Sequence, residues 1–379
     1  MNHAELDELN ISSSAITRLQ KLVASNDAFR LRQFNGHYSD INNNFYWFNA
    51  GFDRKNNSFS LDSFIFRQAL GKDSFLAKRT FQTDYINTKT GAIRIGPIDI
   101  DGYLKDTTLK IGIVNIDNTV FSDFKDKKLP FKAGIIKPLP VNIIKKIPLR
   151  LSIDSVLLNN SFIEYTETAD KSKGSGTIPI TRMAITLTNI KNYGFTGTDS
   201  LRILAIGYLM DTAWLRLRVK ESYTDTSAGF LMTLRMKPAD LRILNPVLIP
   251  LSSVKLVSAY LDTLSMRAVG REYISLGEMR MLYHDLKIRI LKNGDEMNKT
   301  LLSRLTNFIA NSFIIKNKNT SRTGKVFFIR VRDRSALNYL IKIAMSGITS
   351  SIGAKSNRKI MHNYKRELRN RRLPPIDYD

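Results

Sequence analysis

The chain contains no cysteine, and this absence excludes three kinds of site. A disulfide framework, a thiolate zinc centre and a cysteine nucleophile all require that residue. Histidine is also scarce, with four residues in a chain of 379. None of them (His3, His37, His284 and His362) has another histidine or an acid at the spacing typical of metal centres. The sequence therefore predicts no metal ion and no cofactor.

Motifs that carry catalysis are missing as well. Gly174-Ser-Gly176 lacks the Lys-Ser/Thr ending of a phosphate-binding loop and is typical of a hairpin tip. A Gly-x-Ser-x-Gly nucleophile elbow does not occur. His284 and Asp285 are adjacent in an expected strand, so their side chains should point to opposite faces. We therefore predict that the protein has no catalytic residues and is not an enzyme.

A membrane-spanning run is also lacking, since such a helix needs roughly 20 consecutive apolar residues. The first ten residues are polar and acidic and contain no signal-peptide core. If the protein works outside the cytosol, its targeting segment is expected upstream of this sequence.

Acidic residues are few, with 34 Asp and Glu against 58 Lys and Arg, which gives a net charge of +24. Such a balance predicts an anionic partner: a phospholipid surface, lipopolysaccharide or nucleic acid. The basic tail, residues 354–379, offers Arg366, Arg369, Arg371 and Arg372 as candidates for an anionic membrane surface, although a solvated end is equally compatible. Nucleic acid is the weakest alternative, because no nucleic-acid fold motif is present and the positive charge is spread along the chain.

Alternating apolar residues are abundant and favour β-strands. The pattern predicts strands at 59–66, 93–100, 109–113, 149–153, 178–187, 279–291 and 325–332, and a hairpin at 214–237. Helical spacing occurs at 11–34, 296–313 and 335–352, and a connector is expected at 138–148. We expect a mainly β fold: an elongated, twisted, largely antiparallel sheet, with a few amphipathic helices near the C-terminus.

Three segments share one pattern, Val-x-(Ile/Leu)-x-(Asn/Ser)-x-apolar. They begin at Val114, Val156 and Val254. Each places a small polar residue on the face that should be apolar, which suits a bulge or bend between two halves of a strand. Chance matches along a twisted sheet are the alternative.

The ordered blocks LRLSIDSVLLNNSFIEYTE (149–167), IPITRMAITLTNIKN (178–192), MKPADLRILNPVLIPLSSVKL (236–256) and MRMLYHDL (279–286) resemble the AsmA-like family of bacterial envelope proteins. The resemblance covers most of residues 100–353 and is closest to the carboxy-terminal portion of the Bacteroidetes form. It implies a periplasmic, taco-like β-groove that holds or conducts lipids, with an inner-membrane anchor in a segment absent from this chain. We accordingly expect a β-rich groove segment at 1–145, an AsmA-like β-domain at 146–353 and the basic tail at 354–379.

The leading hypothesis is a non-enzymatic envelope protein that binds or conducts lipids and contributes to outer-membrane lipid homeostasis or assembly. Its partners would be a phospholipid or another anionic envelope lipid, the membrane surface and further envelope proteins. The alternatives are a scaffolding envelope protein with a filled core and, more weakly, a basic nucleic-acid-binding protein. From sequence, the lipid-groove candidates are the apolar residues of two expected strand regions: Leu151, Ile153, Leu215, Leu217, Val219, Phe230, Met232, Leu234 and Met236.

Overall fold

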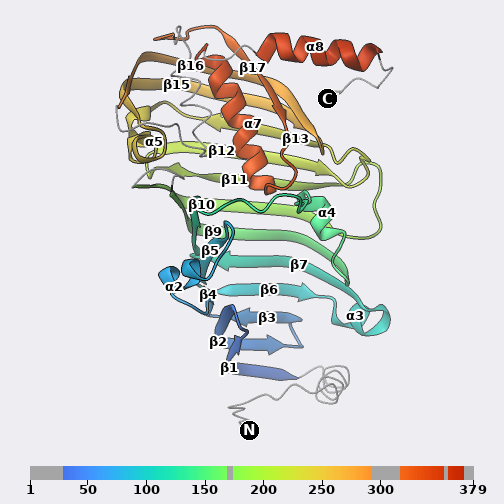
Figure 1. Ribbon diagram of the computed structural model, residues 1–379. Coiled ribbons are helices and arrows are strands. Elements are labelled where there is room, and N and C mark those ends of the chain that lie inside the picture. Colours follow the sequence, from blue (N-terminus) through green and yellow to red (C-terminus); the bar gives the residue numbers. More distant parts are fainter. Residues whose placement is uncertain (1–28, 169–173, 292–315, 354–356, 371–379) are drawn as a thin grey trace.

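A computed structural model describes residues 29–168, 174–291, 316–353 and 357–370 of the chain (Figure 1). These residues form one elongated, twisted sheet of 17 strands with helices on its faces and ends. Neighbouring strands are antiparallel except where β9 runs parallel to β7 and β8. The expectation of a mainly β, largely antiparallel fold is confirmed.

The sheet begins with β1 and continues without interruption to β17. The strands of its N-terminal half are β1 (Arg30–Ser39), β2 (Asn43–Asp53), β3 (Ser58–Leu61), β4 (Ser63–Gln68), β5 (Asp84–Thr90), β6 (Ile93–Ile98), β7 (Thr108–Asp117) and β8 (Val120–Asp126). Those of the C-terminal half are β9 (Arg150–Thr168), β10 (Ser175–Lys191), β11 (Ser200–Leu209), β12 (Ala213–Ser222), β13 (Phe230–Met236), β14 (Ala239–Asp240), β15 (Val254–Gly270), β16 (Ile274–Ile290) and β17 (Thr323–Ile329).

Several strands of the N-terminal half are halves of one bent strand. The pairs β3/β4, β5/β6 and β7/β8 are each separated by one or two residues, and each pair lies beside the next as a unit. Strand β9 accordingly pairs with β7 up to Asn159 and with β8 from Phe162. The sheet therefore has two walls, one formed by β3, β6 and β7 and the other by β4, β5 and β8.

Asparagine occupies the bend in neighbouring strands. Asn118 and Asn160 adopt left-handed backbone conformations, with φ of 52° and 46°, which asparagine tolerates better than most residues. The side-chain amide of Asn160 donates to Oδ1 of Asn118 at 2.7 Å. Ser258 likewise lies at a register shift between β15 and β16. The polar position of the repeated pattern thus marks a bend or a bulge in all three segments, as the sequence predicts.

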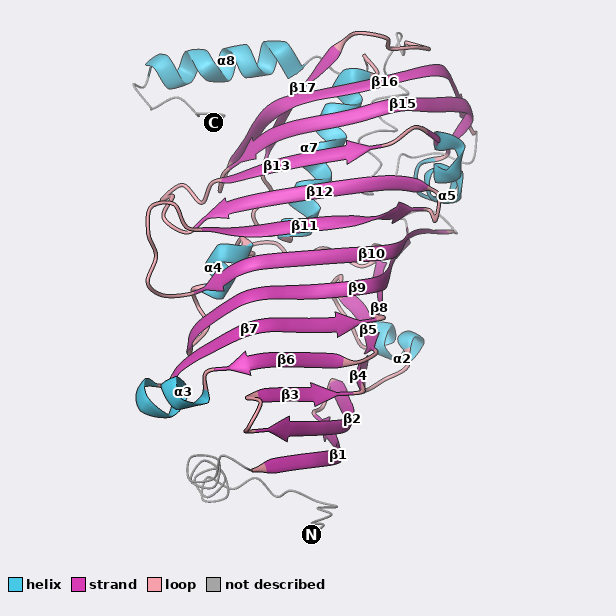
Figure 2. Ribbon diagram, turned by 180° about the vertical axis from the view of Figure 1, so that it is seen from behind, coloured by secondary structure: helices cyan, strands magenta, loops and turns pink. Residues whose placement is uncertain are grey.

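We call the face that carries α7 the inner face and the opposite one the outer face (Figures 1 and 2). The helices are α2 (Lys72–Ala77), α3 (Ile100–Asp106), α4 (Pro140–Ile144), a 3₁₀ turn η1 (Leu241–Leu244), α5 (Asn245–Ser252), α7 (Ala336–Ser351) and α8 (Asn357–Asn370). Helices α4, α5 and α7 pack on the inner face of the C-terminal half. Helix α2 packs on the outer face, where Phe75 contacts Tyr85, and α3 connects β6 to β7.

Most predicted elements appear close to their expected places. The hairpin at 214–237 corresponds to β12 and β13, and the helix expected at 335–352 corresponds to α7. Residues 30–34, where helical spacing was expected, belong instead to β1, because pairing with β2 overrides the local pattern. The rest of that expected helix up to residue 28, and the helix expected at 296–313, lie outside the described residues. The sheet continues across the domain boundary expected at 145/146.

Candidate functional site: an inner apolar surface

Two rows of apolar side chains run along the inner face, perpendicular to the strands. In the first row each residue is the register partner of the next: Phe52, Phe59, Ile95, Val114, Val156, Leu187, Ile203, Val219, Met232, Ala268, Gly277 and Val326. The second row lies two residues along each strand and runs Leu61, Ile93, Ile116, Leu158, Ile185, Ala205, Leu217, Leu234, Met266 and Met279. Since alternate residues of a strand share a face, the inner face is apolar along nearly the whole sheet.

In the C-terminal half these rows are core. Met232, Ala268 and Met279 are 2%, 0% and 0% exposed, and they form one cluster with Tyr339 and Ile343 of α7. Helix α7 begins at the cap Ser335, whose side chain accepts from the backbone N–H of Asn338. The helix thus presents its apolar side to the sheet and closes this half of the inner face.

In the N-terminal half the same rows are half-buried except at Leu61, which is buried, and no described helix packs over them. On the first wall they comprise Phe52, Phe59, Ile93, Ile95, Val114 and Ile116. On the second wall a further row contains the apolar residues Phe45, Phe66, Phe121 and Ile163, with Thr88 of β5 between Phe66 and Phe121. The rings of Phe45 and Phe66 lie 5.1 Å apart. We call the ten apolar residues named in this paragraph the open inner surface.

The candidate groove residues from the sequence lie mostly in the filled half. Val219, Phe230 and Met232 are buried in the α7 cluster, and Leu217, Leu234 and Met236 pack against it. Leu215 is half-buried on the same face of β12. Leu151 is buried, and Ile153 packs against the cluster beneath α4 that contains Val141, Ile190 and Leu201. These residues are therefore covered rather than open, as the filled-core alternative expects for this part of the chain.

The structure places the apolar and the basic residues of the hairpin on opposite faces. Leu217 pairs with Leu234 and Val219 with Met232, while Arg216 pairs with Arg235 on the outer face. The open inner surface was missed, although the alternation at 59–66 and 93–100 was visible in the sequence. The amphipathic pattern at 335–352 was the signal that a helix could cover the hairpin instead.

A charged cluster lies at the junction between the open and filled halves. Lys127, where the chain leaves β8, forms an ion pair with Glu167, whose side chain is fully buried. The Tyr165 hydroxyl donates to Glu167 at 2.7 Å. Burial and the nearby Asp84 carboxylate raise the pKa of Asp123 to about 6. Polar groups therefore interrupt the apolar surface of the second wall here.

The connecting segment 127–139 crosses the inner face from this cluster towards α4 (Figure 1). Its Lys137 N–H donates to the carbonyl of Arg332 at 2.8 Å, and the Arg330 guanidinium donates to the carbonyl of Lys137. Leu139 is 1% exposed within the α7 cluster. The segment thus ties the second wall to the start of α7, at the end of the open inner surface.

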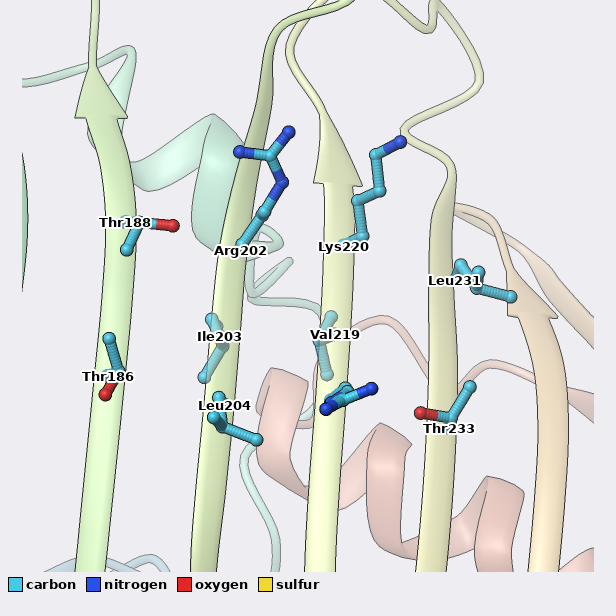
Figure 3. A pocket seen from close by; sticks show the side chains of 10 residues that line it. Thr186, Thr188, Arg202, Ile203, Leu204, Val219, Lys220, Leu231 and Thr233 are labelled. Atoms are coloured by element: carbon cyan, nitrogen blue, oxygen red, sulfur yellow. The ribbon is translucent and has the colours of Figure 1, made fainter.

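The outer face carries a second feature, a strip of cations on three adjacent strands. Its members are Arg202 on β11, Arg216, Arg218 and Lys220 on β12, and Arg235 on β13, which we call the outer basic strip. A shallow pocket of about 440 Å³ lies within the strip, with Thr186, Thr188, Leu204, Leu231 and Thr233 beside the cations (Figure 3). Figure 3 shows Arg202, Lys220 and the pocket residues Leu204, Leu231 and Thr233 on the side of the strands away from the helices.

Part of the basic tail is helical. In α8, Met361 is buried and Tyr364 packs with it against Leu276 and Phe327, on the outer side of β16 and β17. Arg366 and Arg369 are exposed on this helix. Arg371 and Arg372 lie outside the described residues. Binding of an anionic surface by these arginines stays a prediction.

The described residues contain no group of three or more potential metal-ligating His, Asp or Glu side chains. His284 lies on the surface, with Nδ1 2.9 Å from Oδ1 of Asp262. Contrary to the expectation of opposite faces, Nε2 of His284 lies 3.9 Å from Oδ2 of Asp285. The left-handed backbone at Asp285, with φ of 53°, breaks the alternation of the strand. Within the described part of the chain, no helix is long and apolar enough to cross a membrane.

Comparisons with known proteins found no protein-family model and no curated protein that matches the chain.

Proposed function

We propose that this protein binds lipids without chemical turnover, holding acyl chains on the open inner surface. The observation that carries the proposal is the change in exposure along continuous apolar rows. These rows are core under α7 but half-buried in the N-terminal half, where no described helix packs over them. A long apolar strip at the surface is costly in water unless a ligand or partner covers it.

The shape of this surface favours an extended apolar ligand. Its two walls meet along the line of bent strands. Apolar residues line the first wall on each of its strands from β2 to β9, and the second wall on β2, β4, β8 and β9. Acyl chains need apolar contact but no specific hydrogen bonds, so regular rows without convergent polar groups suit them. The buried ion pair of Lys127 and Glu167 lies at one end and marks the limit of this surface.

The proposal extends to an envelope protein that contributes to lipid transport or outer-membrane lipid homeostasis. The resemblance to the AsmA-like family supports this extension and the periplasmic location. Lipid binding itself is supported by the open inner surface and does not depend on this resemblance.

A scaffolding role is the second candidate, and the filled core beneath α7 favours it. In that case another protein, rather than lipid, would cover the open inner surface. The two candidates differ in whether purified protein carries lipid.

The test is a matched pair of substitutions on neighbouring residues of β7. Val114 lies in the inner row, whereas Ile113 points to the outer face and is 46% exposed. We expect Val114→Glu to remain folded and to lose most bound lipid, because a carboxylate would lie among the acyl chains. Ile113→Glu should retain it.

Bound lipid is measured by organic extraction and mass spectrometry, and folding by thermal melting. Equal lipid in the two variants would contradict the assignment of the inner face. Wild-type protein free of lipid, with another protein captured in its place, would favour the scaffold.

A further inference from the structure

The outer basic strip is a concentration of positive charge without internal compensation. Arg202 is the register partner of Lys220, and Arg216 that of Arg235, so cations stand directly opposite each other across strands. Like charges in such pairs repel and destabilise a sheet. No Asp or Glu occupies an outer position of β11, β12 or β13.

The strip differs in this respect from the cations of the N-terminal half. There Arg30 pairs with Asp53, Arg94 with Asp117 and Lys110 with Asp99. Within the described residues, Arg202, Arg218, Lys220 and Arg235 have no ion-pair or hydrogen-bond partner. Desolvation by neighbouring groups, together with the charges of Arg218 and Arg235, lowers the pKa of Arg216. An external anion would relieve this repulsion.

Apolar and aromatic side chains lie among the cations. Leu204, Ile206 and Leu231 are half-buried at outer positions of β11 and β13. At one end of the strip Tyr208 and Trp214 are register partners. Tyrosine and tryptophan have an apolar ring and a polar edge, which suits the interface between lipid and water.

At this end of the strip a cation already lies over each of the two rings. The Arg182 guanidinium lies 3.8 Å from the centre of the Tyr208 ring, and Lys237 Nζ lies 5.0 Å from that of Trp214. Nucleic-acid binding without sequence preference relies on free ring faces on which bases stack. The arrangement therefore favours a layer of anionic head groups over a nucleic acid.

We propose that the outer basic strip docks the protein on an anionic phospholipid bilayer. Arg202, Arg218 and Lys220 would contact phosphate groups, and the threonine hydroxyls of the pocket would donate hydrogen bonds to one of them. Leu204 and Leu231 would contact the lipid between the phosphates. This site lies on the opposite side of the sheet from the open inner surface, and it does not depend on acyl-chain binding there.

The test compares two triple variants that remove the same charge. The strip variant is Arg202→Gln/Arg218→Gln/Lys220→Gln, and the control is Arg30→Gln/Arg94→Gln/Lys110→Gln. Flotation with vesicles of phosphatidylcholine, with and without phosphatidylglycerol, gives the affinity. We expect wild-type protein to bind only vesicles with phosphatidylglycerol, and more weakly as salt rises.

Each cation near an anionic membrane strengthens binding about fivefold, so the strip variant should bind about a hundredfold more weakly. The control variant should retain most of the affinity. A loss of similar size in both variants would mean that only net charge matters, and it would overturn the proposal. An unchanged strip variant would also overturn it.

A competition arm distinguishes the nucleic-acid alternative. A single-stranded oligonucleotide is added to protein bound to vesicles. If it displaces the protein at a concentration below the lipid concentration needed for vesicle binding, and if the strip variant no longer binds the oligonucleotide, the strip binds nucleic acid and the membrane proposal is wrong. Thermal melting of all variants confirms folding, which should be retained because the removed strip charges repel each other.

Discussion

At the residue scale, the structure contains ionisable groups whose burial has measurable consequences. Glu221 is 1% exposed on the inner side of β12, and its Oε1 has no hydrogen-bond partner among the described residues. Desolvation raises its pKa from 4.5 to about 7. The Val141 N–H, Arg330 and Lys145 partly offset this shift, whereas the Glu272 carboxylate adds to it.

The sign of the pH dependence follows from this raised pKa. The native state favours the protonated form of Glu221, so its contribution to stability is fully present below pH 4.5. That contribution is lost as the pH rises towards 7, where the ionised carboxylate must remain buried. A pKa shift of this size changes the free energy of unfolding by roughly 3 kcal/mol between low and high pH.

We predict that Glu221→Gln melts at a higher temperature than wild type at pH 8, with a smaller difference at pH 5. The neutral amide avoids burying a charge, so the variant should lose less stability between these two pH values. Scanning calorimetry at both values measures the change. The same pH slope in both proteins would show that Glu221 is not the titrating group.

At the element scale, helix α7 determines which part of the sheet is core. Inner side chains of β12, β13, β15, β16 and β17 form one apolar cluster with residues of this helix. Leu234 packs against this cluster, while the next residue, Arg235, is exposed on the outer face.

We predict that Leu234→Glu destabilises the protein strongly, whereas Arg235→Glu does not. The first change places an unpaired carboxylate beneath α7, which costs several kcal/mol. The second places a carboxylate beside Arg216 in solvent. Thermal melting of both variants is the measurement, and a Leu234→Glu protein as stable as wild type would mean that α7 does not cover this face.

The sequence predicts the strands of the hairpin and the helix α7 separately, but not the contact between them. Alternation correctly predicted β12, β13 and the orientation of Leu217 and Arg216, because strand residues alternate whatever covers them. Alternation carries no information on what packs against a face. The contact of α7, more than 80 residues further along the chain, could therefore not be derived from the hairpin pattern.

The positions of the bends could be predicted from the sequence, but their alignment across neighbouring strands could not. The repeated polar residue correctly marked Asn118 and Asn160 as bend positions. Their alignment across strands depends on the parallel pairing of β7 and β8 with β9, a long-range register that no local pattern specifies. For the same reason the open inner surface, which depends on these bends, was not found from the sequence.

At the scale of the whole molecule, the sheet has two faces with different chemistry. The inner face carries apolar rows along its length, which the charged cluster around Glu167 interrupts on the second wall, and helices close it over the C-terminal half. The outer face carries the unpaired cations of the outer basic strip. A protein that holds acyl chains on one face and contacts anionic head groups with the other would use both.

The most direct test of lipid binding is crosslinking from single positions on the two faces. A photoreactive amino acid is placed in turn at Val114 on the open inner surface, at Ile113 on the outer face of the same strand and at Met232 beneath α7. Each protein is irradiated in the presence of phosphatidylcholine vesicles, to which the outer basic strip is not expected to dock, and the attached lipid is identified by mass spectrometry. We expect abundant lipid adducts at Val114 and few at Ile113 or Met232. Equal labelling at Val114 and Ile113, or labelling at neither, would contradict this expectation.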